Sequence, residues 1–170
     1  MVAETLTNSL LPIGATHGYA KNLKVHYLTA SIASAAIEDG DIWKMGYLPG
    51  NVMVVGGWMA TTDLDTGTEA LDIDVGWDAA GGSDTYTDPE NGLTFTNSAA
   101  SASATGICNA GVLTGDGVSE VYNPTKNYRA FAFEKPLYFS AKTMIQIEAN
   151  APAGTQAAGT FGVYLLYYSL

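Results

Sequence analysis

Short strand-like segments, separated by turn signals built from Gly, Pro, Asn and Asp, make up almost the whole sequence. One of them, residues 70–77 (ALDIDVGW), alternates strictly, so its apolar residues are predicted to face a core while Asp72 and Asp74 face water. No segment of any length shows the 3.6-residue apolar period of an amphipathic helix. This pattern restricts the chain to an all-β fold made of short strands.

The number and spacing of these segments predict an antiparallel β-sandwich that is jelly-roll-like. The run at residues 52–60 (VMVVGGWMA) fits a strand buried on both faces, with a bulge at Gly56 and Gly57. We expect a single β-sandwich domain over residues 21–170, preceded by an extended N-terminal arm over residues 1–20. Further strands are predicted at residues 23–29, 41–48, 93–96, 119–122, 129–134, 137–139, 144–149 and 161–168.

The charge balance excludes some classes of partner. Of the 170 residues, 17 are acidic and 7 basic, which gives a net charge of −10. Such a charge repels phosphate backbones, so nucleic acid is not expected as a partner. No basic residue lies between Lys44 and Lys126, so part of the surface is predicted to be strongly negative, either for solubility or for docking onto a basic partner or cations.

The cysteine count and the apolar runs limit compartment and chemistry. The one cysteine, Cys108, cannot form an internal disulfide or a multi-thiolate metal site. The opening residues lack a basic stretch ahead of an apolar one, and no apolar run approaches the ~20 residues that span a bilayer. We therefore expect neither an exported precursor nor a membrane protein, and stability that comes from packing and assembly.

The string DLDTGTE contains the candidate metal ligands, Asp63, Asp65 and Glu69. Calcium prefers several carboxylate oxygens converging from one loop. The helix-flanked calcium loop, however, has its glycine at the sixth position, whereas Gly67 is fifth here and the flanks are strands. Asp and Thr also stabilise tight turns by bonding to nearby backbone. The sequence therefore predicts a hairpin turn, with no metal and no cofactor.

No group of residues in the sequence indicates catalysis. Asp72 and Asp74 share a face of a strand, and strict alternation predicts that both are solvated rather than opposed across a cleft. His17, His26 and Cys108 could pair only in principle, because Cys108 lies among small residues with no adjacent cation to lower its pKa. The motifs of nucleophile elbows, P-loops and zinc proteases are absent. We expect a protein that is not an enzyme and has no catalytic residues.

Aromatic residues concentrate towards the end of the chain, where core packing accounts for most of them. Tyrosine is enriched at protein interfaces, so some of these residues are predicted to form a subunit contact. They are Tyr164, Tyr167 and Tyr168. Leu10 and Leu11 are predicted to make contacts of the same kind from the N-terminal arm.

Three stretches of the sequence together resemble the small virion structural proteins of tailed bacteriophages, including head decoration, or cement, proteins. They are residues 39–57 (DGDIWKMGYLPGNVMVVGG), 61–78 (TTDLDTGTEALDIDVGWD) and 159–170 (GTFGVYLLYYSL). The resemblance covers roughly residues 38–78 and 142–170, about two fifths of the chain, and it rests on turns that shape the fold rather than on catalytic residues. It implies a jelly-roll-like domain that assembles, often as a homotrimer, on the capsid lattice.

The resulting hypothesis is a decoration protein on the outer surface of the virion capsid, with the major capsid protein as its partner. The alternative is a receptor- or glycan-binding module of a phage tail or fibre, because jelly rolls also serve as lectins. A carbohydrate site would draw on Trp43, Trp58 and Trp77, although Trp58 lies in the strand predicted to be most buried.

Overall fold

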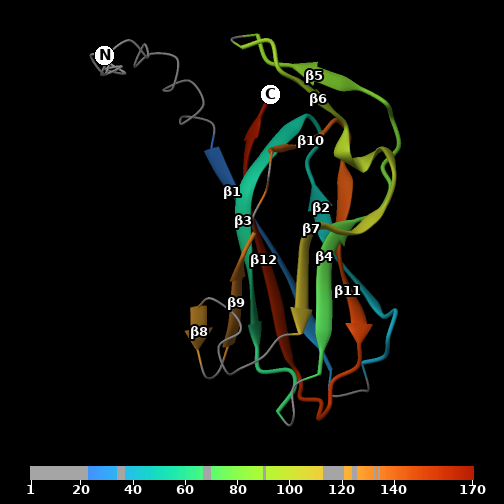
Figure 1. Cartoon of the computed structure of the whole chain (residues 1–170), viewed down its shortest axis with the longest axis vertical. Helices are drawn as coiled ribbons and strands as arrows, with labels where there is room; N and C mark the ends of the chain where they lie inside the picture. Colours follow the sequence, from blue (N-terminus) through green and yellow to red (C-terminus); the bar gives the residue numbers. More distant parts are fainter. Residues whose placement is uncertain are drawn as a thin grey trace, which may run out of the picture.

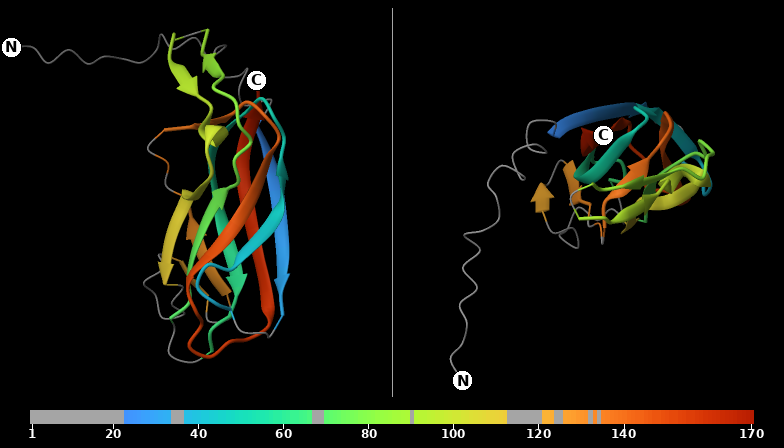
Figure 2. Two further views of the ribbon diagram at one scale, coloured as in Figure 1. Left: turned by 90° about the vertical axis from the view of Figure 1, so that its right-hand side faces the viewer. Right: turned by 90° about the horizontal axis from the view of Figure 1, so that it is seen from above.

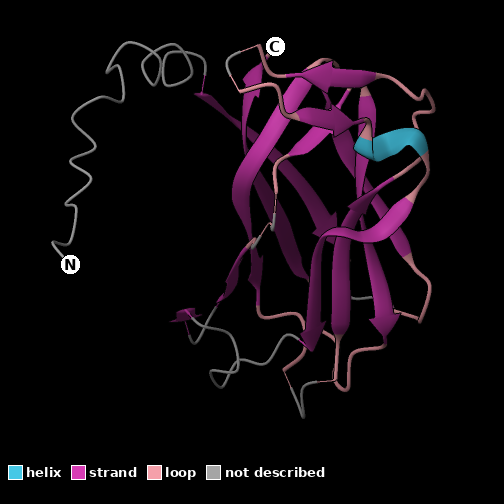
Figure 3. Ribbon diagram, turned by 45° about the horizontal axis from the view of Figure 1, so that its top comes forward, coloured by secondary structure: helices cyan, strands magenta, loops and turns pink. Residues whose placement is uncertain are grey.

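The computed structural model describes two antiparallel β-sheets packed face to face, with a small hairpin at one end (Figure 1). The described residues are 23–33, 37–66, 70–89, 91–112, 121–123, 126–131, 133 and 135–170. The predicted arm at residues 1–20 lies outside them. The all-β sandwich predicted from the sequence is confirmed, and one 3₁₀ turn, η1 (Ser98–Ala100), is the helical element of the described chain (Figure 3).

Sheet A runs in the order β1-β12-β3-β9-β8, with β10 paired to β3 beyond the end of β9. Its strands are β1 (Leu23–Ile32), β12 (Gly159–Ser169), β3 (Val52–Thr62), β9 (Lys126–Ala130), β8 (Val121–Asn123) and β10 (Leu137–Phe139). Sheet B runs in the order β2-β11-β4-β7. Its strands are β2 (Ile42–Leu48), β11 (Thr143–Ala151), β4 (Asp72–Trp77) and β7 (Ser103–Val112).

The strand pairing is that of a jelly roll. Strand β1 pairs with β12, β2 with β11, β3 with β9 and β4 with β7, as in one long hairpin, and rolling it up adds the pairs of β3 with β12 and of β4 with β11. Successive strands from β1 to β4 alternate between the two sheets, which places them as two layers (Figure 2). This is the double-sheet arrangement that the short, evenly spaced strands predicted.

The core lies between the inner faces of the sheets. Alternate residues of β12, beginning at Phe161 and ending at Tyr167, point inward and are buried, and Ile145 and Ile147 of β11 face them from sheet B. At one end of the core the ring of Trp77 packs edge-on against Phe139, with 5.2 Å between centroids. Burial of these side chains supplies most of the free energy that opposes chain entropy, since the chain has no disulfide.

Central strand β3 contains the predicted bulge. Its register against β12 shifts between Leu166 and Tyr167, next to Gly56 and Gly57. Gly57 has φ +154°, and a Cβ there would lie 2.1 Å from the carbonyl oxygen of Tyr164. Only glycine fits where two backbones approach this closely.

Strand β7 was not predicted, because its sequence (SATGICNAGV) lacks the bulky residues that mark a strand. The small residues have a tertiary cause. A Cβ on Gly106 would lie 2.2 Å from the Trp77 ring, so the strand pairs with β4 only because it leaves room for that ring. The requirement comes from a residue far away in the sequence, which a local pattern cannot reveal.

The prediction that Asp72 and Asp74 are both solvated is wrong. Asp74 is 2% exposed and Asp72 is partly buried. Their strand, β4, lies in the interior of sheet B between β11 and β7, and Asn150 donates a side-chain hydrogen bond to the Asp74 carboxylate. Alternation correctly identified the inner face of β4, but it could not show that neighbouring side chains also cover the outer face.

The hairpin of β5 (Thr85–Thr87) and β6 (Thr94–Thr96) lies at one end of the sandwich (Figure 1). Buried Asn97 holds its base in place. The Asn97 amide group donates to the carbonyl oxygens of Gly81 and Gly82, and its side-chain oxygen accepts from the backbone N–H groups of Ala99 and Ser140.

Candidate functional site

The outer face of sheet A bears a row of stacked aromatic rings. Tyr27 of β1, Tyr164 of β12 and Trp58 of β3 are direct cross-strand neighbours. The Tyr27 and Tyr164 rings stack with centroids 4.4 Å apart, and the Tyr164 and Trp58 rings stack at 4.8 Å. Such pairs add about 0.5–1.5 kcal/mol each beyond their burial, so the row is a rigid feature of the surface.

Aliphatic side chains extend this row along the sheet. Leu23 and Val25 of β1 are 48% and 57% exposed, and Tyr27 is 53% exposed. Leu166 of β12 is the cross-strand partner of Val25 and lies over Gly56. We call the set the apolar face, and its members are Leu23, Val25, Tyr27, Trp58, Tyr164 and Leu166.

The apolar face contains half of the six large hydrophobic side chains that are exposed within the described part of the chain. Clusters of this kind on a soluble surface mark interaction sites more often than isolated exposed residues do. The sequence showed the signal, since Leu23, Val25 and Tyr27 share one face of strand 23–29, opposite Lys24, His26 and Leu28. It could not show which face points outward.

A shallow hollow adjoins the aromatic row. Its walls include Tyr27, Tyr164 and the threonines Thr62 and Thr160. Gly162 forms part of the floor, because a Cβ there would lie 3.1 Å from the Tyr27 ring. The hollow combines aromatic and hydroxyl surface and has a size suited to a side chain rather than to a cofactor.

The pKa of Tyr164 is raised above its usual value, first by desolvation and then by the hydrogen bond and charge of the Tyr27 phenol. Tyr164 stays uncharged at neutral pH, because an ordinary tyrosine already titrates near 10 and the pKa of this one is higher. The apolar face therefore carries no charge of its own at physiological pH.

The structure separates the three tyrosines predicted to form an interface. Tyr164 belongs to the apolar face, whereas Tyr167 points into the core, is 7% exposed and meets the His26 ring edge-on. Tyr168 points outward and is partly buried, and its pKa is raised by burial and then by Tyr86 and Asp88 of the β5–β6 hairpin region. Leu10 and Leu11 lie outside the described residues.

Among the candidate metal ligands, the structure gives Asp65 a role in holding two loops together. Asp65 is 3% exposed, and its carboxylate accepts hydrogen bonds from the backbone N–H groups of Ala70, Leu71, Gly154 and Thr155. These four hydrogen bonds satisfy the acceptor capacity of the carboxylate. They also link the loop after β3 to the loop before β12. A cation would have to displace these donors.

The other candidate ligands are Asp63 and Glu69. Asp63 is exposed, and Glu69 lies outside the described residues. Within the described ranges, no group of three or more His, Cys, Asp or Glu side chains is placed to hold a metal ion.

The possible cysteine–histidine pair is not assembled by the residues that the structure describes. His26 lies on β1, where its Nε2 is 3.0 Å from the carbonyl oxygen of Tyr47. Cys108 lies on β7, which forms the opposite edge of sheet B from β2, the strand that His26 contacts. His17 lies outside the described chain.

The tryptophans also lie apart. Trp43 packs towards Phe161, with ring centroids 6.2 Å apart. The Trp77 indole N–H donates to the Ser101 carbonyl at 2.9 Å, and Trp58 lies on the outer face of sheet A. The three do not form a shared carbohydrate platform.

Comparison with known proteins gives structural matches alone. No family model matches the chain, and no curated protein matches it. A chain of the cyanophage Pam1 capsid asymmetric unit is similar, with a TM-score of 0.60 and 22% identity over 88% of this chain and 86% of that chain. A chain of the capsid of Ralstonia phage GP4 has a TM-score of 0.58 and 19% identity, over 88% and 85% respectively. At these identities the likeness shows a shared fold.

No helix in the described part of the chain has the length and apolarity needed to cross a membrane.

Proposed function

We propose that this protein is a structural component of a tailed-phage virion that decorates the capsid and stabilises it without catalysis. The observation that carries the proposal is the apolar face, which is exposed on a sandwich whose described residues form no metal cluster. The shared fold with chains from two phage capsids supports it. The sequence motifs of the turns and strands resemble the same class of protein.

The mechanism is the burial of interface. A protein that binds only the assembled lattice of the major capsid protein stabilises that lattice by mass action, by about 2.7 kcal/mol per site at a free concentration 100 times Kd. The apolar face suits this role, since apolar surface contributes roughly 25 cal/mol for each Å² removed from water. In this proposal the protein forms a homotrimer on the outer surface of the capsid and buries the apolar face in the assembly.

Co-sedimentation tests the proposal. Purified full-length protein is mixed with capsids that lack it, and bound protein is measured in the capsid pellet across a concentration range. The proposal expects saturable binding. Protein that stays in the supernatant at every concentration would contradict it.

Matched substitutions locate the contact. Tyr27→Ala and Tyr164→Ala remove aromatic surface from the apolar face, and interface aromatics of this kind commonly contribute more than about 1 kcal/mol, or roughly fivefold in affinity. Tyr47→Ala is the control, because Tyr47 is also 50% exposed but lies on β2 of sheet B. We expect the first two to weaken capsid binding and the control to leave it unchanged.

The glycan-binding alternative gains no support from the aromatic row. Tyr164 lies between Tyr27 and Trp58, so both faces of its ring are covered by other rings. A sugar stacks on an open ring face, and the middle ring of this row offers none.

A further inference from the structure

Strand β1 is an edge of sheet A, and its His26 side chain contacts the Tyr47 carbonyl oxygen of β2. It ends sheet A, and β12 is its one strand partner among the described residues. Its ten residues pair with β12 in unbroken register from Leu23 to Ile32, without a bulge, a proline or a glycine. The view from above shows β1 along the outer side of the molecule (Figure 2). A long, regular, apolar edge is a template for another strand.

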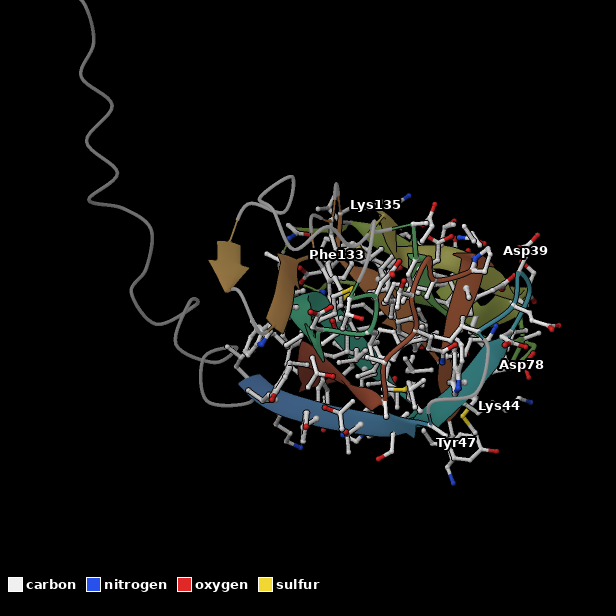
Figure 4. All side chains as sticks on the ribbon, turned by 90° about the horizontal axis from the view of Figure 1, so that it is seen from below. Asp39, Lys44, Tyr47, Asp78, Phe133 and Lys135 are labelled. Carbon is white, nitrogen blue, oxygen red and sulfur yellow. The ribbon has the colours of Figure 1, made fainter. Side chains whose placement is uncertain are left out.

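The neighbouring edge, β2, has the features that discourage such pairing. Its register against β11 shifts between Ile145 and Gln146, and Gly46 there has φ +146°. Charged groups also crowd it: Lys44 lies 3.4 Å from Asp78, and the Lys142 ammonium lies 4.1 Å from the centre of the Tyr47 ring. Figure 4 shows Lys44, Tyr47 and Asp78 together on this side of the molecule. Bulges are a usual means of blunting an edge; each of the two strands contains one lysine, but β1 has no bulge.

We infer that residues 5–11 of a second copy of this chain add to the free edge of β1 as an extra strand. The sequence there, TLTNSLL, combines leucines with threonines and ends before Pro12. Threonine favours strands, and a proline stops one. The added strand would place leucines beside Leu23 and Val25, where apolar side chains are already exposed.

The length of the connecting segment permits exchange between copies. Residues 12–22 separate the proposed strand from β1, and eleven extended residues reach about 36 Å. The ten residues of β1 span about 34 Å. The segment is therefore long enough to carry residues 5–11 past the end of their own domain.

The charges also agree. Glu4 is the one Asp, Glu, Lys or Arg side chain in residues 1–20, and Lys24 is the one such side chain on β1. They have opposite signs, so an arm laid along β1 meets no like charge.

Folding back onto the same chain is disfavoured by sequence. A tight hairpin into β1 would pair residues 11–20 with it, and this stretch contains Pro12, Gly14 and Gly18. Proline removes a ladder hydrogen bond, and glycine weakens a strand.

Cross-linking of full-length chains tests the inference. In a Cys108→Ala background, a tagged chain with Leu10→Cys is mixed with an untagged chain with Val25→Cys and treated with a short bismaleimide. The control mixture replaces Val25→Cys with Leu93→Cys, which is equally exposed but lies beside β6. We expect at least tenfold more tagged–untagged dimer from the first mixture. A Tyr27→Lys substitution in the Val25→Cys chain is expected to reduce that dimer, because a charge on the edge opposes strand addition.

Equal yields from the two mixtures would overturn the inference. So would a link that forms only within single chains carrying both Leu10→Cys and Val25→Cys, which would mean that the arm folds back on its own domain. The inference rests on the proposed function only in that assembly supplies neighbouring copies. The cross-link is measured without capsids, so the two tests are independent. Absence of the cross-link would not contradict capsid binding, and absence of capsid binding would not contradict the cross-link.

Discussion

At the scale of single residues, Asp65 shows that a carboxylate with the sequence context of a cation ligand can instead accept backbone hydrogen bonds. In the sequence it is one of three acids in a short loop, which is the composition of a cation site. In the structure it is buried and accepts four backbone hydrogen bonds. Two of its donors, Gly154 and Thr155, lie about 90 positions away in the chain. No local pattern could have identified them.

Replacing Asp65 with asparagine should destabilise the fold. Asp65→Asn removes the charge and turns one acceptor oxygen into a donor that faces backbone N–H groups. Leaving such buried donors unsatisfied costs about 1–3 kcal/mol. Urea denaturation at pH 7 measures the loss in the free energy of unfolding. Asp63→Asn, in the same loop but exposed, is the control and should change that free energy by less than about 0.5 kcal/mol.

The same residue predicts an acid-dependent loss of stability. Burial opposes ionisation of Asp65, but the four backbone N–H donors outweigh it and hold its pKa below the ordinary value. A carboxyl with a lowered folded-state pKa stabilises the fold above the unfolded pKa of about 3.9, and this stabilisation is lost as pH falls through the folded pKa. The difference in unfolding free energy between the native chain and Asp65→Asn should therefore shrink below about pH 4. A difference that stays constant down to pH 2 would contradict this assignment.

At the scale of elements, the sequence predicts strands well where side chains alternate or where a run is wholly apolar. The strands at residues 52–60, 137–139 and 161–168 are confirmed by β3, β10 and β12. Strand β7 was not predicted because it contains small residues instead of bulky ones. Gly106 among them leaves the space that the Trp77 ring occupies. The outward face of β1 escaped because Leu23, Val25 and Tyr27 form the more apolar side of the strand, which a local pattern would assign to the core, whereas the structure exposes it.

Near the bulge in β3, position 57 requires glycine, whereas position 56 has room for a larger residue. Gly57→Ala would force a side chain against the Tyr164 carbonyl at a positive φ, and we expect a loss of about 2–4 kcal/mol in unfolding free energy. Gly56→Ala meets its nearest neighbour, Leu166 Cδ1, at 3.7 Å and should cost less than about 1 kcal/mol. Thermal unfolding of the two variants side by side compares them. Similar melting temperatures would contradict the bulge geometry.

At the scale of the whole molecule, an acidic sandwich combines a net charge of −10 with one uncharged apolar face. The charge keeps copies apart in solution except where an interface is specific. The prediction that remains to be tested is the homotrimer. Light scattering over a concentration range should give three times the 17.8 kDa chain mass, and Tyr27→Lys, which places a charge in the apolar face, should lower it. A monomer at every concentration would contradict trimer formation.

The central claim is that this protein stabilises a capsid. The most direct test heats capsids that lack the protein, with and without saturating amounts of it, and follows the temperature at which the shells come apart by light scattering. The account predicts a higher disruption temperature with the native chain and a smaller increase with Tyr164→Ala. An unchanged disruption temperature, with the native chain bound at saturation, would contradict it.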